Sequence, residues 1–536
     1  MDLVSLLTTT TSKGNPNAWD ISKAYYDAGS ENGDLSKAFY TNISKGIALQ
    51  EGNPTGLFFK PDGSKMYICG SSGDDVNEYD LSIPWLVSSA TPLQTFSVSA
   101  QETVPAGLFF KPDGTKMYVV GRTGVDINEY DLSTAWDVSS ASYVQNFSVS
   151  TEEAEPNDIF FKPDGTKMYI CGSSGDDVNE YSLSSAWDIS TASYVQNFSV
   201  STEELTPTGL SFTSNGAKMY ICGDSGDDIN EYDLSTAWDI STASYVQNFS
   251  VASQNNSPQA IFFLPIGAGF YFVGDSGGTP DTVFQYVIGG FSITAEEATP
   301  TDVFFKPDGT KMYVIGTTGD DVNEYSLSSA WDITTASYVQ NFSVGAQETQ
   351  PNGLFFKPDG TKMYVVGITG DDVNEYDLSS AWDISTASYV QVFSVAAQDN
   401  QPNGIFFKPD GTKMYISGVS NDDIYEYDLS SAWDVSSASY LQTYGGAGTG
   451  LNNENPQSLF FKPDGTKMYV YTTTRFVKEF SLSTPWDISS ASPTQNFSVG
   501  GQDSAPRGLF FRDDGTQFFL AGQTSDRVFS YKISPI

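Results

Sequence analysis

The chain has 536 residues and a formal net charge of −40, from 66 acidic and 26 basic side chains, and it contains no histidine. A charge of this sign repels nucleic-acid phosphates and anionic membrane surfaces, while the lack of histidine excludes Ser/His/Asp and Cys/His nucleophilic sites. No run of residues approaches the roughly eighteen apolar residues that a membrane span requires. We therefore expect neither a nucleic-acid partner nor membrane insertion.

The N-terminal residues 1–17 are predicted to form an extension outside any repeat. Their apolar run, Met1 to Leu7, is too short and too uncharged for a secretory signal peptide, so no signal peptide is recognised. Residues 18–22, Ala-Trp-Asp-Ile-Ser, copy a connector that recurs along the chain, and the run around residues 43–49 precedes the first repeat as a fourth strand would. Both segments are expected to help close a ring of repeats.

Ten repeated units of about fifty residues follow, and each of them opens on a proline. Most of these prolines are 51 residues apart, and the interval falls to 42 after the fifth unit. They are Pro54, Pro105, Pro156, Pro207, Pro258, Pro300, Pro351, Pro402, Pro456 and Pro506. Internal repetition with this period is typical of propellers and of other repeat architectures.

The unit of residues 351–401 represents the others. Its strand-like runs are 354–357, 362–366, 373–378 and 389–395. The Asp359-Gly360 pair between the first two runs predicts a tight turn, because glycine accepts a positive φ, and a serine-rich connection with Trp382-Asp383 follows the third run. Four short antiparallel strands without helical periodicity predict an all-β fold built from four-stranded propeller blades. β-Solenoid coils are usually shorter, and β-sandwich domains are usually longer.

The pattern FFKPDGTKMYV, a glycine, a loop with aspartate and then VNEYDLS resembles the YVTN-type and lactonase-like β-propeller repeats, over nearly the whole chain from about residue 54 to residue 534. The resemblance implies the fold and says little about function, because propellers have many unrelated functions. The regular acidic units also resemble virion or tail-associated propellers of marine phages. The Trp-Asp pairs do not match WD repeats, since they follow the third strand and have no Gly-His partner.

Units five and ten depart from the pattern in the same ways. Where the other units have an aromatic-containing Lys-Met-Tyr, these units have residues 270–272 (Phe-Tyr-Phe) and 517–519 (Gln-Phe-Phe), and neither is followed by a Trp-Asp segment. A ring closes best when an early strand completes its last blade, because an open sheet edge is a liability. We therefore predict two five-bladed propellers, residues 18–288 and 291–536, with residues 291–294 beginning the second. A single ten-bladed ring is the alternative.

Acidic residues are predicted to gather on one face of the propellers, because the loops after the second and fourth strands share that face. Clustered carboxylates suit Ca²⁺, which prefers oxygen ligands, although their spacing matches no known calcium loop. The alternative is that each Asp pair ends a hairpin and binds backbone amides. The expected cofactor is therefore none, with calcium as the one candidate. The candidate ligand- or cation-binding residues are Asp74, Asp75, Asp126, Asp176, Asp177, Asp227, Asp228, Asp320, Asp321, Asp371, Asp372, Asp422 and Asp423.

The opposite face is predicted to be basic, because fifteen of the 26 basic residues flank its Lys-Pro-Asp-Gly-Thr-Lys turns. The molecule is therefore expected to be electrically two-faced. The tryptophan of each connector is expected to wedge between blades rather than stack on a sugar. The mid-strand glutamate that recurs in seven units, Glu375 in the representative one, is expected to make a structural hydrogen bond.

Repetition of the polar residues argues against an enzyme, because a catalytic site is a local asymmetry in which one or two carboxylates gain a special environment. Repeats that each offer the same shallow site suit multivalent recognition. We therefore expect no catalytic residues and a structural or adhesive binding protein of a virion or of the extracellular or cell surface. Its partner is expected to be a surface carbohydrate or another virion or surface protein. The alternative is a carboxylate-based propeller enzyme, either a glycosidase or lactonase-like.

Overall fold

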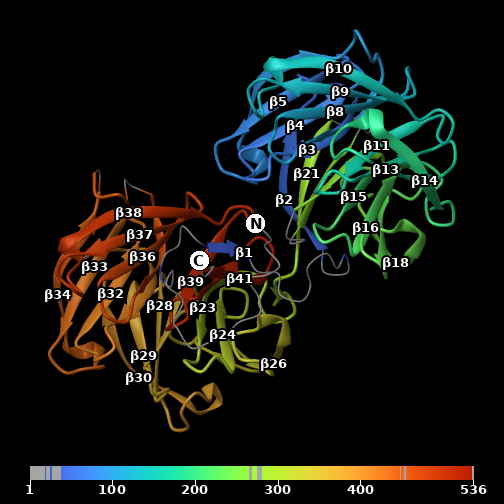
Figure 1. Ribbon diagram of the computed structural model, residues 1–536. Coiled ribbons are helices and arrows are strands. Elements are labelled where there is room, and N and C mark those ends of the chain that lie inside the picture. Colours follow the sequence, from blue (N-terminus) through green and yellow to red (C-terminus); the bar gives the residue numbers. More distant parts are fainter. Residues whose placement is uncertain are drawn as a thin grey trace. The chain divides into compact units, whose positions relative to one another are not determined.

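The computed structural model describes residues 19, 24–26, 35, 38–264, 269–274, 281–446, 448–451 and 454–533. Regular structure within these ranges consists of β-strands and short 3-10 turns, which confirms the all-β prediction. None of the helical turns described there is long and apolar enough to pass through a membrane. The chain divides into two compact units, Ser30–Gly289 and Met1–Gly29 with Gly290–Ile536, called here the first and second propeller (Figure 1).

Eight of the ten blades are four-stranded antiparallel meanders in chain order. In the first propeller they are β3–β6 (Pro54–Phe59, Lys65–Gly70, Asp75–Leu81, Ala90–Ser97), β7–β10 (Pro105–Phe110, Lys116–Gly121, Asp126–Leu132, Ala141–Ser148), β11–β14 (Pro156–Phe161, Lys167–Gly172, Asp177–Leu183, Ala192–Ser199) and β15–β18 (Pro207–Phe212, Lys218–Gly223, Asp228–Leu234, Ala243–Ser250). In the second propeller they are β23–β26 (Pro300–Phe305, Lys311–Gly316, Asp321–Leu327, Ala336–Ser343), β27–β30 (Pro351–Phe356, Lys362–Gly367, Asp372–Leu378, Ala387–Ser394), β31–β34 (Pro402–Phe407, Lys413–Gly418, Asp423–Leu429, Ala438–Gly445) and β35–β38 (Pro456–Phe461, Lys467–Thr472, Phe476–Leu482, Ala491–Ser498).

A single 3-10 turn precedes the fourth strand of each of these blades. The turns are η5 (Val87–Ser89), η6 (Val138–Ser140), η7 (Ile189–Thr191), η8 (Ile240–Thr242), η9 (Ile333–Thr335), η10 (Ile384–Thr386), η11 (Val435–Ser437) and η12 (Ile488–Ser490). In η10, the Asp383 side chain accepts a hydrogen bond from the backbone N–H of Ser385, as expected of an N-cap aspartate. In seven of the eight turns the aspartate of the Trp-Asp pair is the N-cap, whereas in η5 the N-cap is Leu86, which makes no side-chain cap bond.

The last blade of each propeller takes its outer strand from a distant part of the chain. In the first propeller, β19 (Pro258–Phe263), β20 (Gly269–Gly274) and β21 (Thr282–Ile288) are completed by β2 (Ala38–Gly46). In the second, β39 (Pro506–Phe511), β40 (Gln517–Gly522) and β41 (Arg527–Ile533) are completed by β1 (Ala24–Tyr26) and β22 (Phe291–Ser292). The innermost strands contact one another in two closed cycles, β3-β7-β11-β15-β19 and β23-β27-β31-β35-β39. These are two five-bladed rings.

The outer strand of the last blade in the second propeller is split between two segments of the chain. β1 pairs with one end of β41, Ala24 opposite Ile533, and β22 pairs with its other end, Ser292 opposite Arg527. Together they take the place of the single fourth strand of a regular blade. The whole first propeller therefore lies, in the chain, between the two halves of one strand of the second.

The N-terminal boundary of the first propeller differs from the expected residue 18. Trp19 belongs to the second propeller, where its ring stacks on Phe460 and Phe511 at centroid distances of 6.3 and 5.6 Å and its N–H donates to Gly515 O at 2.9 Å. The connector motif predicts that Trp19 packs between two blades, but it does not predict which propeller these blades belong to. The fifth blade of each propeller lacks a connector tryptophan, so Trp19 could have packed in either one. The predicted extension, residues 1–17, lies outside the described residues.

The connector tryptophans join neighbouring blades, as predicted. Trp433 is buried and adopts a φ of 67°, and its ring covers Gly411, where an added Cβ would lie 2.4 Å from the indole. The Tyr364 hydroxyl of the preceding blade donates to Trp433 O at 2.7 Å, and the two aromatic rings are stacked. A glycine is thus required at 411 by a positive φ and by close packing.

The recurring mid-strand glutamates also make the structural bonds that the sequence predicts. Glu375 is buried, pairs with Lys362 Nζ at 2.5 Å, and accepts hydrogen bonds from Gln391 Nε2 at 2.9 Å and from the N–H of Val435 in the next blade at 3.1 Å. The glutamate therefore ties three strands and two blades together.

The expected basic face is not formed. Each of the fifteen lysines that flank the turns pairs with an aspartate or glutamate of its own blade. Lys357, for instance, lies 2.7 Å from Asp359, and Lys362 lies 2.6 Å from Asp377. The prediction of an electrically two-faced molecule is wrong, because carboxylates next to the lysines neutralise them.

Candidate functional site

The predicted aspartates lie in the turn between the second and third strands, each pair on its own blade. The first member of a pair has a left-handed backbone, as Asp371 has with a φ of 49°, and the second begins the third strand. Asp372 accepts a hydrogen bond from Asn374 Nδ2 at 2.7 Å. Where the structure describes the chain, no three acidic or cysteine side chains are grouped closely enough to hold a metal ion. The geometry is that of a hairpin turn.

In each blade that carries a predicted aspartate, a buried carboxylate comes from the loop before the blade. Glu348 is fully buried and accepts hydrogen bonds from the N–H groups of Gln350 at 2.7 Å and Thr369 at 3.1 Å. Burial, with the charge of Glu348 as the second cause, raises the pKa of Asp372 to about 6. These carboxylates fix the loops of the acidic face, and the two acidic groups stand close enough to influence one another.

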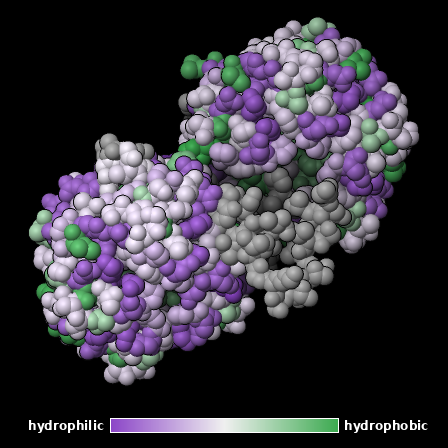
Figure 2. All heavy atoms as spheres, turned by 60° about the vertical axis from the view of Figure 1, so that its left-hand side comes forward, coloured by the Kyte–Doolittle hydropathy of each residue, from purple (hydrophilic) through white to green (hydrophobic). Residues whose placement is uncertain are grey.

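Six exposed tyrosines, called here the rim tyrosines, lie on the fourth strands of six blades. They are Tyr143, Tyr194, Tyr245, Tyr338, Tyr389 and Tyr440, each 43–45% exposed. Each is followed by an exposed valine or leucine. Figure 2 shows that hydrophobic residues on the visible surface form small separate spots among hydrophilic ones. A scattered exposed hydrophobe is ordinary, but the same pair repeated in six blades is a surface pattern.

Each rim tyrosine has the same surroundings. Its ring packs edge-on against a buried tyrosine of the third strand at 5.8–5.9 Å. The hydroxyl of that buried tyrosine lies 3.3–3.5 Å from a loop Glu or Gln side chain. Next to Tyr194, for example, Tyr181 donates to Glu152. Burial, and then the charges of Asp177 and Glu152, raise the pKa of Tyr194.

Among the described side chains, the exposed tyrosine followed by an exposed valine or leucine occurs on three successive blades of each propeller. In the fifth blade of the first propeller, the corresponding Tyr40 lies opposite Tyr286 and is half-buried. At the corresponding position, the blade β3–β6 has Pro92, opposite Tyr79, and the blade β35–β38 has Pro493, opposite Phe480. The recurring Ala-Ser-Tyr-Val-Gln segment was visible in the sequence, but only the burial pattern of the fourth strand shows that its tyrosine is exposed. Sequence reasoning placed the candidate site on the aspartates beside it.

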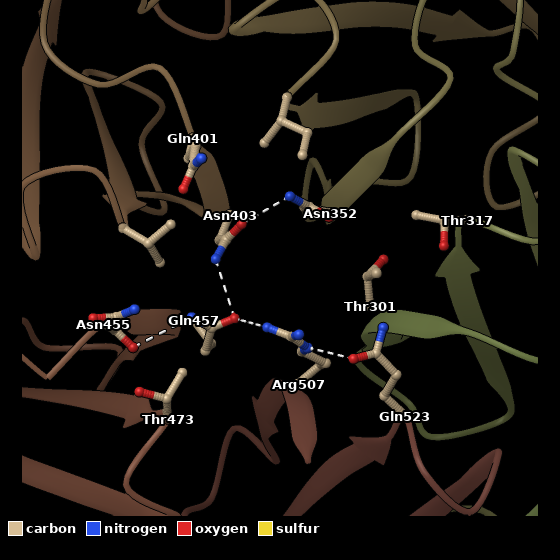
Figure 3. Close-up of a pocket in the computed structure, with 12 residues that line it drawn as sticks. Thr301, Thr317, Asn352, Gln401, Asn403, Asn455, Gln457, Thr473, Arg507 and Gln523 are labelled. Atoms are coloured by element: carbon tan, nitrogen blue, oxygen red, sulfur yellow. Dashed lines mark hydrogen bonds between the residues drawn. The ribbon is translucent and has the colours of Figure 1, made fainter.

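A polar pocket of about 380 Å³ opens on the axis of the second propeller (Figure 3). The second residue of every innermost strand lines it, and these residues are Thr301, Asn352, Asn403, Gln457 and Arg507. Their side chains form a chain of hydrogen bonds. Asn352 Nδ2 donates to Asn403 Oδ1 at 2.7 Å, Asn403 Nδ2 donates to Gln457 Oε1 at 3.1 Å, and Arg507 Nη1 donates to the same Gln457 oxygen. The pocket combines amides and hydroxyls with one cation.

One carboxylate per propeller is buried on the axis, at the third residue of an innermost strand. Asp302 accepts hydrogen bonds from the N–H groups of Val303 at 2.9 Å and Leu354 at 2.9 Å, and it lines a narrow axial cavity in the second propeller. In the first propeller, Asp158 accepts the equivalent hydrogen bonds from the N–H groups of Ile159 and Leu210. Burial raises the pKa of Asp302 to about 7 and that of Asp158 to about 8, against the opposing effect of these N–H groups.

Sequence reasoning missed both axial aspartates, although a signal was present. The third residue of the innermost strand is glycine in six units, Ala260 in one and Ser458 in one, and aspartate only in these two. Ser458 accepts the N–H of Leu509 at 3.1 Å, so it provides a neutral counterpart of the same bond. A departure at one position of an otherwise regular repeat marked these residues.

No protein-family model and no curated protein matches this chain. Among solved structures, the chain is similar to a functionally unknown protein from Desulfotomaculum acetoxidans DSM 771. The two share 10% sequence identity with a TM-score of 0.26, and the alignment covers 72% of this chain and 96% of the other. Overlap at that level adds nothing to the fold described above.

Proposed function

We propose that this protein is a non-catalytic, multivalent binding protein whose rim tyrosines each bind one unit of a surface carbohydrate. The observation that supports this is the sixfold repetition of one arrangement, an exposed tyrosine packed against a buried tyrosine whose hydroxyl meets a loop carboxyl or amide group. An aromatic ring covers the apolar face of a sugar, and the neighbouring carboxyl or amide oxygen accepts hydrogen bonds from its hydroxyls. Each contact is weak, and several together add through effective concentration.

The setting that we propose is a virion or an extracellular or cell surface. The resemblance of the repeat to YVTN-type and lactonase-like propellers, and to propellers of phage particles, supports a structural and adhesive role there. The charge of −40 favours solubility and opposes binding to nucleic acid. A protein partner in such an assembly is the competing form of this proposal.

We propose further that binding needs no resident metal ion. The second aspartate of a pair already accepts hydrogen bonds from asparagine side chains, as Asp177 does from Asn179 at 2.6 Å and from Asn197 at 2.5 Å. Such partners support the hairpin role of the Asp pairs over a calcium role. Retention on glycans should therefore be the same with millimolar Ca²⁺ and with a chelator.

Changing the rim tyrosines to alanine should weaken glycan binding in steps. With the full chain on a glycan array, Tyr194→Ala should reduce retention slightly, and alanine at all three rim positions of one propeller should reduce it by roughly tenfold or more. Tyr194→Phe keeps the ring and should retain binding, and Leu93→Ala, in a blade without a rim tyrosine, is the matched control. These exposed changes should shift stability by only about 0.5 kcal/mol.

Two results would contradict the glycan proposal. Full retention after alanine replaces all six rim tyrosines would place the binding surface elsewhere. Binding to a protein of a virion or cell surface, with no glycan bound at any density, would favour the protein partner instead.

A second candidate function, a carboxylate-based enzyme, is supported by one observation. Asp302 stands alone on the axis beneath the pocket, and a carboxyl group whose pKa lies near 7 can act as an acid or a base at neutral pH. Turnover of an arylglycoside or a lactone that disappears in Asp302→Ser would establish this alternative and overturn the non-catalytic proposal.

A further inference from the structure

We infer that the axial pocket of the second propeller binds a small hydroxylated carboxylate, such as a single sugar acid, with its carboxylate on Arg507. This site is separate from the rim tyrosines and does not rest on their role. All five blades contribute residues to its lining, so it exists only in the closed ring. A pocket of about 380 Å³ has the size of a small ligand site.

Arg507 gives the pocket a positive charge. It is partly buried, its Nε donates to Gln523 Oε1 at 2.9 Å, and its Nη1 donates to Gln457 (Figure 3). Both acceptors are neutral amides, and a guanidinium has five N–H donors. Among the described residues that line the pocket, none is acidic and no second cation is present.

The carboxylate whose charge acts on Arg507 is already used elsewhere. Asp503 is fully buried and accepts hydrogen bonds from the N–H groups of Ala505 at 2.6 Å and Ser525 at 2.9 Å. The guanidinium is thus held in place by amides without an ion pair to a carboxylate. In a chain where the turn lysines are all paired with acids, this arrangement points to an anionic ligand.

The other lining residues match hydroxyl groups. Asn352, Asn403 and Gln457 present amide groups that both donate and accept, and Thr317 and Thr473 add hydroxyls. A sugar hydroxyl also donates and accepts, so such a lining fits a polyhydroxylated molecule. A single arginine can bind one carboxylate through two parallel hydrogen bonds, whereas a phosphate site usually contains several cations or backbone N–H groups. The single arginine of this pocket therefore favours a carboxylate.

The first propeller provides an internal comparison. At the positions of Thr301, Asn352, Asn403, Gln457 and Arg507 it has Thr55, Ala106, Asn157, Thr208 and Gln259. Its Arg122 donates to Asn157 Oδ1 at 2.9 Å, but the loops that correspond to the lining segments also carry the exposed acids Glu155 and Asp224. The anionic ligand is therefore expected at the second propeller alone.

Binding of D-glucuronate to the full-length protein, measured by calorimetry and by saturation-transfer NMR, tests this inference. The wild-type protein should bind D-glucuronate and should bind neutral D-glucose at least about tenfold more weakly. Arg507→Gln, which copies the residue of Gln259 in the first propeller, should weaken glucuronate binding by at least about tenfold. Arg507→Lys keeps the positive charge but cannot make two parallel hydrogen bonds to a carboxylate, so its affinity for glucuronate should lie between those of the wild type and Arg507→Gln. Arg122→Gln should bind as the wild type does, and so should the variant with alanine at all six rim positions.

Several outcomes would overturn the assignment. They are equal binding of glucose and glucuronate, tighter binding of inorganic phosphate, unchanged binding by Arg507→Gln, and no binding of glucuronate or galacturonate by the wild-type protein. Loss of uronate binding in the rim variant would place the ligand on the rim. Because the rim variants report the proposed adhesive function and the Arg507 variants report this pocket, failure of one is distinguishable from failure of the other.

Discussion

Replacing Trp19 with alanine should lower the free energy of unfolding of the second propeller by about 3–5 kcal/mol and leave the first propeller unchanged. Trp19 is 7% exposed, and its indole stacks on Phe511 and on Tyr469 at 5.6 and 5.9 Å. Its carbonyl also accepts a hydrogen bond from the Tyr469 hydroxyl at 2.7 Å. Loss of the ring removes a wedge between two blades although the residue lies near the start of the chain.

Hydrogen exchange with peptide resolution separates the two rings in the intact protein. In Trp19→Ala, protection should fall in peptides from residues 290–533 and stay unchanged in peptides from residues 38–264. The matched control is Trp136→Ala, since Trp136 stacks on Phe110 and Phe58 in the first propeller and should give the reverse pattern. Faster exchange throughout the first propeller in Trp19→Ala would show that its N-terminal boundary has been misplaced.

The stability of both propellers should decrease as the pH rises from 4 to 8, because of Asp158 and Asp302. Folding raises the pKa of these carboxyls to about 8 and about 7, above the value near 3.9 of an unfolded chain. The folded state therefore holds a proton that the unfolded state releases. Stability from each group is complete below pH 4, and it falls by about 1.4 kcal/mol per pH unit until the folded pKa is passed.

Serine at the two axial positions should remove this part of the pH dependence. Asp302→Ser copies Ser458, which keeps the acceptor for the next blade's N–H without a titrating group. Denaturant unfolding at pH 4 and pH 8 should show a smaller difference for the double variant Asp158→Ser and Asp302→Ser than for the wild type. Repulsion within a chain of −40 also grows with pH, but it acts on both proteins alike.

Asp308 contributes to stability with the opposite pH dependence to the axial aspartates, so the variant Asp308→Asn serves as a contrast to them. Although partial burial acts against it, hydrogen bonds from Lys306 and Thr310 lower the pKa of Asp308 to about 2. Its contribution is present above pH 4 and is lost as the pH falls toward 2.

A wild-type protein and an axial double variant with the same pH dependence of stability between pH 4 and pH 8 would contradict the axial assignment.

Features that recur in most units could be predicted from the sequence. The Asp-Gly turn, the wedge tryptophan and the mid-strand glutamate follow from local chemistry, which is the same in each blade that carries them. Glu375 could be assigned a structural role because seven copies of one residue cannot all be special. Reasoning from repetition failed for Lys357 and Lys362. The prediction of a basic face summed the lysines on one face of the propeller, whereas each lysine is neutralised by the nearest carboxylate.

Features that occur in only one or two units were the difficult ones. Asp302 and Arg507 each stand at a position where most other units carry a different residue, and averaging over units hides them. The repeat pattern also could not predict which strand completes which ring, because β1 and β41, which pair with each other, lie far apart in the sequence. Long-range pairing depends on closure of the whole ring, which no single unit encodes.

The split outer strand has a consequence for synthesis on the ribosome. The first propeller has all of its strands once β21 has emerged, so it can fold while translation continues. The second must keep β1 unpaired until β41, the last strand, is made. The earliest-made part of one ring therefore waits through the synthesis of the other.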